Sequence, residues 1–335
     1  MLENPVLTIK QTVNLPSKVL HGARIEFKAI LDIVRYGPPD IMLQFGGGIG
    51  DELLLTAVAH ELKKRRADLK IWQVSHSEEL LVDNPDYDRV FSMDHWPLRY
   101  ALFLEKRRCR LAYARERVPR KEEIPPRVHI IAELCRKAGI RGEVLIRPYL
   151  FLSDEEKRAG RLAQNQIAIQ CIGDDSYATV MRNKLWDPGK FQRVVDKIRS
   201  DSNGMIQIIQ VGTEGDRLLE GVTDLRGKTA LRQVAAILSQ SVCFIGTVGL
   251  LMHLARAVEC RSVVIYGGRE HSTQTGYICN ENLNSYLECS PCWLWNDCGN
   301  GRKCMEMIEV DHVIRAYEQV QRRKGLPLET EVTRL

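Results

Sequence analysis

Apolar residues along this chain follow two alternating patterns: short continuous runs, and longer segments in which they recur every three or four positions. The first run, at 41–45, ends in glycines and is followed by a helical pattern over 51–66. Strand, glycine turn and helix in this order are typical of a nucleotide-binding α/β layer. The other apolar runs predict strands at 70–74, 89–93, 167–171, 206–211, 242–246 and 262–266.

Helical patterns separate these strands in both halves of the chain. The segment 229–240, for example, places Leu231, Val234 and Leu238 on one face. Strands that alternate with helices predict an α/β fold with two doubly wound parallel sheets facing each other. The remaining helices are expected at 127–138, 191–201, 251–258 and 311–324.

The length of 335 residues is typical of two domains rather than one. Because the polar segment 154–164 precedes a new apolar strand, we place the domain boundary there. The expected parts are an N-terminal extension at 1–40, an N-terminal domain at 41–165, a C-terminal domain at 166–310, and a C-terminal helix and tail at 311–335.

In the extension we expect a strand at 23–33, closed by a glycine-proline turn. Its apolar residues Phe27, Ile30 and Ile33 would make oligomer contacts or pack against the N-terminal domain. The Arg-rich region 96–126 gives no clear pattern.

The composition is that of a globular protein, with 44% hydrophobic and 27% charged residues. The formal net charge of +5 favours anionic ligands but falls short of a nucleic-acid-binding signature. We find neither a secretory signal nor a run of about 18 to 20 apolar residues that would span a bilayer. We therefore expect a cytoplasmic protein without a nucleic-acid partner, and leave peripheral membrane contact open.

The glycine turn Gly46, Gly47, Gly48, Ile49, Gly50 precedes Asp51 at the carboxyl end of the first strand. Open α/β sheets bind ligands at this edge, and a helix N-terminus favours anions. The turn is not G-x-G-x-x-G with an acid on the second strand, which argues against a dinucleotide site. The spacing of Asp51 fits an N-cap as well as a catalytic carboxylate, so both interpretations stay open at this point.

A series of short motifs carries a resemblance to a known family. The first half contains Gly50, Asp51 and Glu52, followed by Asn84 and Pro85. Together the motifs resemble glycosyltransferase family 9, the ADP-heptose:lipopolysaccharide heptosyltransferases and their relatives, over roughly residues 41–320. The second half continues the match with the segments 184–186, 224–229, 244–246, 252–255 and 264–267.

The resemblance implies a GT-B fold, with two Rossmann-like domains facing a cleft. The acceptor would bind the N-terminal domain and the nucleotide sugar the C-terminal one. The family's catalytic Asp matches Asp51, which would accept the proton of the acceptor hydroxyl during direct displacement with inversion. No catalytic metal is expected, so Lys184, assisted by Arg182, would stabilise the leaving diphosphate. Both cations also fit a solvated loop.

The resemblance assigns the remaining donor contacts to loops and helix ends of the second half. A helix N-terminus beginning near Gly249 would hold the diphosphate. His253 fits a structural histidine as well as a ligand contact, and Glu270 fits a surface pair with Arg269 as well as a contact to donor hydroxyls. The expected donor-binding set is Gly50, Arg182, Lys184, Thr213, Glu214, Lys228, Thr229, Thr247, Gly249, Leu250, Leu251, His253 and Glu270.

The chain departs from the family at one point that bears on the donor. Relatives usually carry Asp-Ser/Thr-Gly before the Met-His helix, whereas this chain has Thr247, Val248 and Gly249. Because that Asp contacts the donor sugar in the family, ADP-heptose does not carry over directly, although an ADP-sugar is favoured. The hydroxyl of Thr247 is expected to substitute in part.

Four cysteines follow the spacing C-x2-C-x5-C-x5-C at Cys289, Cys292, Cys298 and Cys304. Four thiolates at such spacing predict a structural zinc or iron site, and some relatives of the heptosyltransferases carry an iron-binding Cys motif in this region. Four reduced cysteines in a loop, or a disulfide pair, are the alternatives.

The sequence thus predicts an inverting glycosyltransferase that moves a sugar, heptose or a related one, from a nucleoside diphosphate to a saccharide, glycan-precursor or protein acceptor. Two other function classes stay open: a nucleotide-sugar epimerase or hydrolase of the same fold, and a non-catalytic nucleotide-sugar-binding protein. A homo-oligomer is a further expectation.

Overall fold

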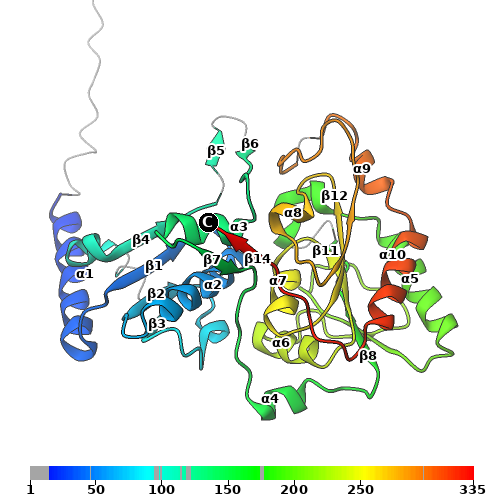
Figure 1. The fold of residues 1–335 in the computed structure, drawn as a ribbon, viewed down its shortest axis with the longest axis horizontal. Helices are drawn as coiled ribbons and strands as arrows, with labels where there is room; N and C mark the ends of the chain where they lie inside the picture. Colours follow the sequence, from blue (N-terminus) through cyan, green and yellow to red (C-terminus); the bar gives the residue numbers. More distant parts are fainter. Residues whose placement is uncertain are drawn as a thin grey trace, which may run out of the picture.

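The computed structural model describes residues 15–45, 47–93, 98, 100–113, 115–117, 122–173, 177–296 and 298–335. Gly46 of the predicted glycine turn lies outside these residues. Two separate parallel sheets are present, one in each half of the chain (Figure 1). This confirms the predicted α/β fold with two Rossmann-like sheets.

The N-terminal sheet has the strand order β3-β2-β1-β4, and all of its strands run parallel. Its central strand, β1 (Ile41–Phe45), is followed directly by α2 (Ile49–Arg65). Residues 52–59 of α2 are all buried, because the helix packs against its own sheet, α3 and α7. The other elements of this domain are β2 (Ile71–Ser75), η1 (Glu78–Leu81), β3 (Arg89–Ser92), η3 (Leu102–Arg107), β4 (Arg108–Leu111), β5 (Arg115–Arg117), β6 (Glu122–Ile124), α3 (Ile130–Lys137) and β7 (Glu143–Leu145).

The C-terminal sheet has six parallel strands in the order β10-β9-β8-β11-β12-β13. Its central strands are fully buried, as expected for a parallel sheet covered on both faces. The strands are β8 (Gln166–Ile169), β9 (Gln207–Gln210), β10 (Thr223–Asp224), β11 (Phe244–Thr247), β12 (Ser262–Gly267) and β13 (Glu281–Asn284). The helices are η4 (Tyr177–Lys184), α5 (Pro188–Asp201), α6 (Leu231–Ser239), α7 (Leu250–Ala257), α8 (Ser272–Thr275), α9 (Lys303–Glu306) and α10 (Val310–Arg322).

Two connections join the halves of the molecule. The first contains the short helix α4 (Asp154–Ala159), which packs on α6. In the second, the end of the chain returns from α10, and β14 (Val332–Arg334) pairs antiparallel with β7 of the N-terminal half (Figure 1). The chain therefore crosses between the two sheets more than once, which ties them together. The boundary at 165 itself stays a prediction.

The strand predicted at 23–33 is wrong: these residues lie in α1 (Leu15–Tyr36), a long helix. Ile25, Ala29 and Ile33 are spaced four residues apart, which is the period of a helix face, and they pack against the cluster around Trp72 and Phe91. The turn residues after Tyr36 can end a helix or a strand, so only the four-residue spacing of the apolar positions distinguishes the two.

The other predicted strands and helices are present, with ends shifted by a few residues. Within the described residues, no helix combines the length and apolar character needed to cross a membrane.

Candidate active site

Asp51 occupies the third position of α2, where its two carboxylate oxygens accept different hydrogen bonds. Oδ2 accepts from the backbone N–H of Gly48 at 3.0 Å, and Oδ1 accepts from the hydroxyl of Tyr113 at 2.7 Å. A Cβ on Gly47 would lie 2.2 Å from Asp51 Oδ2, so the glycine allows the carboxylate to fold back over the turn. Asp51 thus closes the N-terminus of its own helix, as the capping interpretation expects.

The N-termini of α2 and α7 meet where the two halves of the molecule touch. A Cβ on Gly50 would lie 3.5 Å from Cα of Leu250, the first residue of α7. The two helices also pack on each other along their length. Asp51, which follows Gly50, is therefore held beside the C-terminal half.

The environment of Asp51 favours its protonated form. Burial is the largest influence and raises the pKa of Asp51 above its ordinary value. The hydrogen bonds from Tyr113 and Gly48 and the charge of Lys184 lower this pKa in part, whereas the charge of Glu270 raises it. A carboxyl group with a raised pKa is a better proton acceptor when ionised, which suits a general base.

A buried group of charges faces Asp51 from the C-terminal half. Nζ of Lys184 lies 2.6 Å from Oε1 of Glu270, and the Arg269 guanidinium contacts the same oxygen. Burial alone would raise the pKa of Glu270, but Lys184 and Arg269 together lower it to about 2. Glu270 is therefore ionised at neutral pH, and it is not the exposed partner of a surface pair, because only 6% of its side chain is exposed.

Aromatic side chains connect this charge group to Asp51. The Tyr113 ring lies 5.5 Å from the Phe45 ring and 6.4 Å from the Trp293 ring, measured between centroids. Arg269 lies over the face of Trp293 at 5.3 Å, and Nε1 of Trp293 donates to Oε1 of Gln274. The carboxylate, the aromatic rings and the charge group form one continuous site from both halves of the chain.

Comparison with known proteins bears on this arrangement. The sequence model of glycosyltransferase family 9 (heptosyltransferase) matches residues 153–296. This segment of the chain is similar to glycosyltransferase family 9. The lipopolysaccharide heptosyltransferase 3 of Escherichia coli (strain K12) is 27% identical over 156 residues, which are 41% of this chain and 42% of that protein. The matched part thus spans about two fifths of that curated relative.

Several solved structures share the fold of this chain. The iron-containing, dodecameric heptosyltransferase TibC, in complex with ADP-D-β-D-heptose, has a TM-score of 0.65 at 16% identity, over 86% of this chain and 77% of that chain. The E. coli ADP-heptose lipopolysaccharide heptosyltransferase II has a TM-score of 0.61 at 16% identity, over 84% of this chain and 99% of that one. A family 9 protein from Veillonella parvula DSM 2008 has a TM-score of 0.61 at 14% identity, over 84% and 96%. The GT-B fold is therefore shown.

Two of the predicted donor-binding residues near α7 are buried. The Nδ1 atom of His253 lies 2.6 Å from the Tyr277 hydroxyl, and burial lowers the pKa of His253 to about 3. His253 is thus neutral at pH 7. Thr247, at the end of β11, is 2% exposed, and its Oγ1 has no hydrogen-bond partner among the described groups. A buried hydroxyl without a partner is an unusual feature and suits a ligand contact.

The residues matched to the ribose and base contacts lie on two adjoining loops after β9 and β10. The hydroxyl of Thr213 contacts Oδ1 of Asp216 at 3.1 Å, and Glu214 is exposed beside it. Nζ of Lys228 donates to Oδ2 of Asp224 at 2.9 Å. Thr229 follows directly. The loops approach closely, because a Cβ on Gly227 would lie 3.0 Å from Cβ of Glu214.

The cysteine loop supports the segment that carries Lys184. Backbone N–H of Asn183 donates to O of Trp295 at 3.1 Å, and that of Arg182 donates to Oδ1 of Asn296 at 2.8 Å. The Arg182 side chain is exposed at the edge of this contact. The loop thus packs between η4 and the end of β12, where a Cβ on Gly268 would lie 2.1 Å from Oγ of Ser290.

The four predicted metal ligands lie in the same loop. The Cys298 sulfur accepts from the N–H of Arg302, and that of Cys289 accepts from the Asn300 side chain, both at 3.3 Å. Burial raises the pKa of the Cys292 and Cys304 thiols, and charge on Cys298 adds to both shifts. However, no three His, Cys, Asp or Glu side chains among the described residues form a group that could hold a metal ion. The four thiols do not fit a closed ligand shell here, so we assign no reaction step to a metal.

Sequence reasoning missed three features of the site. Tyr113 lies in the Arg-rich region without a clear pattern, and nothing in its spacing points to Asp51. Glu52, next to Asp51, is buried and bonds to Ser75 and to the His76 ring, whose Nδ1 lies 2.6 Å from Oε1. Nε2 of His129 lies 2.9 Å from O of Gly276, which joins the two halves. Each of these contacts spans more than 20 residues of sequence, so no local signal could have found them.

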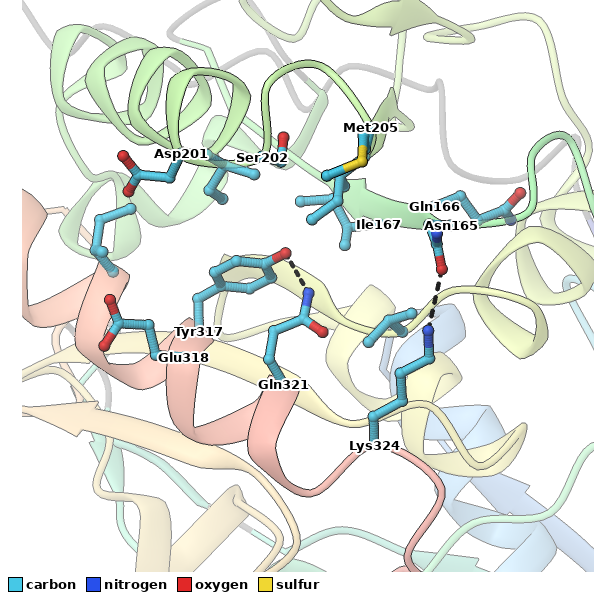
Figure 2. A pocket seen from close by; sticks show the side chains of 14 residues that line it. Asn165, Gln166, Ile167, Asp201, Ser202, Met205, Tyr317, Glu318, Gln321 and Lys324 are labelled. Atoms are coloured by element: carbon cyan, nitrogen blue, oxygen red, sulfur yellow. Dashed lines mark hydrogen bonds between the residues drawn. The ribbon is translucent and has the colours of Figure 1, made fainter.

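A cavity of about 410 Å³ lies away from these residues, between α5 and α10. Figure 2 shows Tyr317 and Gln321 paired at its floor and Lys324 bonded to Asn165 at 3.0 Å. Because α5 and α10 lie at the end of the molecule remote from the N-terminal sheet (Figure 1), this cavity is separate from the candidate active site.

Proposed function

We propose that this protein transfers a sugar from a nucleoside diphosphate donor to a hydroxyl group of an acceptor, with inversion. Asp51 accepts the proton of the acceptor hydroxyl while the hydroxyl oxygen attacks the anomeric carbon of the donor sugar. The bond from that carbon to the diphosphate oxygen breaks, and the nucleoside diphosphate leaves with the bonding electrons. The observation that carries the proposal is the partly buried carboxylate of Asp51, with a raised pKa, opposite the Lys184 ammonium.

Positive groups of the C-terminal half stabilise the leaving diphosphate. Lys184 supplies a cation that is 14% exposed, and the first turn of α7 supplies N–H groups that no side chain caps. The exposed loop at Thr213 and Glu214 and the loop at Lys228 and Thr229 bind the nucleoside. The family match favours an ADP-sugar, and a saccharide, glycan precursor or protein is the acceptor class.

A donor panel tests this proposal. Thermal unfolding with ADP-, GDP-, UDP- and CMP-sugars identifies the nucleotide, because a ligand that binds the folded state raises Tm. Product analysis with donor and candidate acceptors then identifies transfer. Consumption of donor in the absence of acceptor indicates a hydrolase or epimerase, and binding without turnover indicates a non-catalytic protein.

Metal binding and self-association are separate proposals. The Cys spacing and the iron of TibC support a structural ion at Cys289, Cys292, Cys298 and Cys304, whereas the thiol positions described above do not. Metal analysis of the purified protein, with a Cys292→Ser/Cys298→Ser control, decides whether the loop binds an ion or carries four thiols without a metal. The dodecameric state of TibC supports a homo-oligomer.

A further inference from the structure

Helix α1 has apolar residues on two opposite faces. Ile25, Ala29 and Ile33 face the N-terminal domain and pack against its core cluster. On the opposite face, Leu20 is 71% exposed and Phe27 is 63% exposed. A helix that is apolar on both sides is normally covered on both sides. Among the described residues nothing covers the face that carries Leu20 and Phe27, which we call the outer face of α1.

The outer face follows the heptad pattern of helices that pack on each other. Leu20, Ala23, Phe27, Ile30 and Val34 are separated by three, four, three and four residues. At about 100° per residue these positions form one stripe along the helix. Such a, d spacing lets the side chains of one helix fit between those of a facing helix. The pattern therefore points to another helix as the occupant of this face.

The apolar surface continues from α1 onto η3. The N–H of Leu102 donates to Oε1 of Glu26 at 2.7 Å, which places the start of η3 beside the stripe. Leu102 is 75% exposed and Phe103 is 60% exposed. The exposed parts of the stripe and these two residues amount to on the order of 800 Å², which is about one partner's share of a standard protein interface. Isolated monomers rarely expose apolar patches of this size.

We propose that the outer face of α1, with Leu102 and Phe103, is the contact surface between two copies of this chain. In a two-fold pair the same surface is used by both copies, so each stripe packs against its equivalent. The charges fit this better than a membrane surface. An interfacial helix has Lys and Arg over the face opposite its apolar one, whereas on α1 that face carries Ile25, Ala29 and Ile33, which pack against the domain core, together with the acidic Asp32. The basic residues Arg24, Lys28 and Arg35 border only one side of the stripe, and Glu26 lies on the other.

Figure 1 shows that the geometry leaves room for such a pair. Helix α1 forms the outer end of the N-terminal half, remote from the C-terminal sheet. A second copy docked there would leave Asp51 and the contact between α2 and α7 uncovered. The proposal is therefore independent of the proposed function, and its test does not use activity.

Sedimentation velocity of the full chain over a range of concentrations tests the proposal. The variant is Leu20→Glu/Phe27→Glu, which places charges on the stripe without touching the packed face. The matched control is Met205→Glu, since Met205 is 72% exposed on the C-terminal half. We expect the wild type and the control to self-associate, and the double variant to raise the dimer Kd at least 100-fold or to remove one level of a larger assembly. Circular dichroism verifies that all three remain folded.

A photo-crosslinking amino acid at position 27 provides a second measurement, and mass spectrometry should find it joined to α1 of another copy. A wild type that is monomeric throughout, a double variant that associates like the wild type, or a crosslink to a different segment would overturn the proposal. Flotation with phosphatidylcholine/phosphatidylglycerol vesicles completes the test. A monomer that binds these vesicles through the same two residues would assign the face to a membrane instead.

Discussion

The helices α2 and α7 occupy equivalent positions in the two halves, yet their N-termini differ in chemistry. Each follows a central strand of a parallel sheet and begins after a glycine. In α2 the carboxylate of Asp51 accepts the N–H of Gly48. In α7 the first turn contains no acid, and its N-cap residue, Gly249, has no side chain to make a capping hydrogen bond. One helix therefore presents a carboxylate to the domain contact, and the other presents N–H groups that suit an anion.

Under the proposed function, this difference would let one repeated fold unit serve both partners of the transfer, the acceptor and the donor. A helix N-terminus that carries its own carboxylate repels a diphosphate but can receive a proton. A helix N-terminus without one attracts the diphosphate. The close contact of Gly50 with Leu250 brings the two ends together. Substitutions that remove the carboxylate near the start of α2, or the groups that would bind an anion near the start of α7, test whether this difference between the two helix ends is needed for the proposed function.

The largest effect is expected from Asp51→Asn. The amide still accepts from Gly48 but cannot take up a proton, so transfer should fall by roughly 1,000-fold, within the usual range for a general base. Because the pKa of Asp51 is raised by burial, its ionised form destabilises the fold as pH rises. The variant should therefore be at least as stable as the wild type at pH 7.

Steady-state rates, Tm and ADP binding check the Asp51→Asn prediction. Asp68→Asn makes the same change in charge at an exposed position beyond the end of α2, and should behave like the wild type. Turnover within a few-fold of wild type would exclude Asp51 as the base, and would leave it with the capping role alone.

A smaller effect is expected from Lys184→Met. A charge-assisted contact to a phosphate contributes about 1.5 to 3 kcal/mol, so ADP affinity should fall by roughly 10- to 150-fold. The variant Glu270→Gln distinguishes a direct contact between Lys184 and the phosphate from a structural role of the Lys184–Glu270 ion pair. It releases the Lys184 ammonium, so ADP should bind at least as tightly as to the wild type. Isothermal calorimetry measures both, with Lys157→Met on α4 as the control. Equal losses of affinity in the two variants would mean that Lys184 acts only through Glu270.

Tyr113→Phe should change the pH dependence more than the maximal rate. The Tyr113 hydroxyl lowers the pKa of Asp51, so its removal raises that pKa further. The acidic limb of kcat/KM should then move to higher pH, with a loss of up to about 10-fold at pH 7. Tyr286→Phe, at a residue that is 77% exposed, is the control. An acidic limb at the wild-type pH would show that Tyr113 does not position or tune the base.

Particular residues show how far the sequence could predict this molecule. Strand β1, the glycine turn and α2 follow from local spacing, because a parallel sheet repeats one simple unit. The position of Asp51 at the start of α2 follows from local spacing too, whereas its role as the base came from the family resemblance and stays a prediction. Tyr113 could not, since its partner is 62 positions away. In α1 the helical spacing of Ile25, Ala29 and Ile33 is present in the sequence, but apolar residues on both faces of the helix obscured that period.

The smallest effect, and the sharpest comparison between the two helix ends, is expected from Thr247→Val. Because Oγ1 of Thr247 is buried and has no hydrogen-bond partner in the part of the chain that the structure describes, its replacement by a methyl group should leave the free energy of unfolding unchanged or raise it by about 1 kcal/mol. Donor affinity should nevertheless fall several-fold if, as proposed, the hydroxyl contacts the donor in place of the Asp that the resemblance to family 9 leads us to expect beside α7. The control is Thr56→Val on α2, whose hydroxyl donates to O of Leu53 and accepts from the N–H of Tyr149. That variant should lose stability by about 1 to 3 kcal/mol, because buried groups lose their partners. Chemical denaturation and donor titration of both variants separate the two effects. Unchanged donor affinity in Thr247→Val would show that the hydroxyl does not contact the sugar.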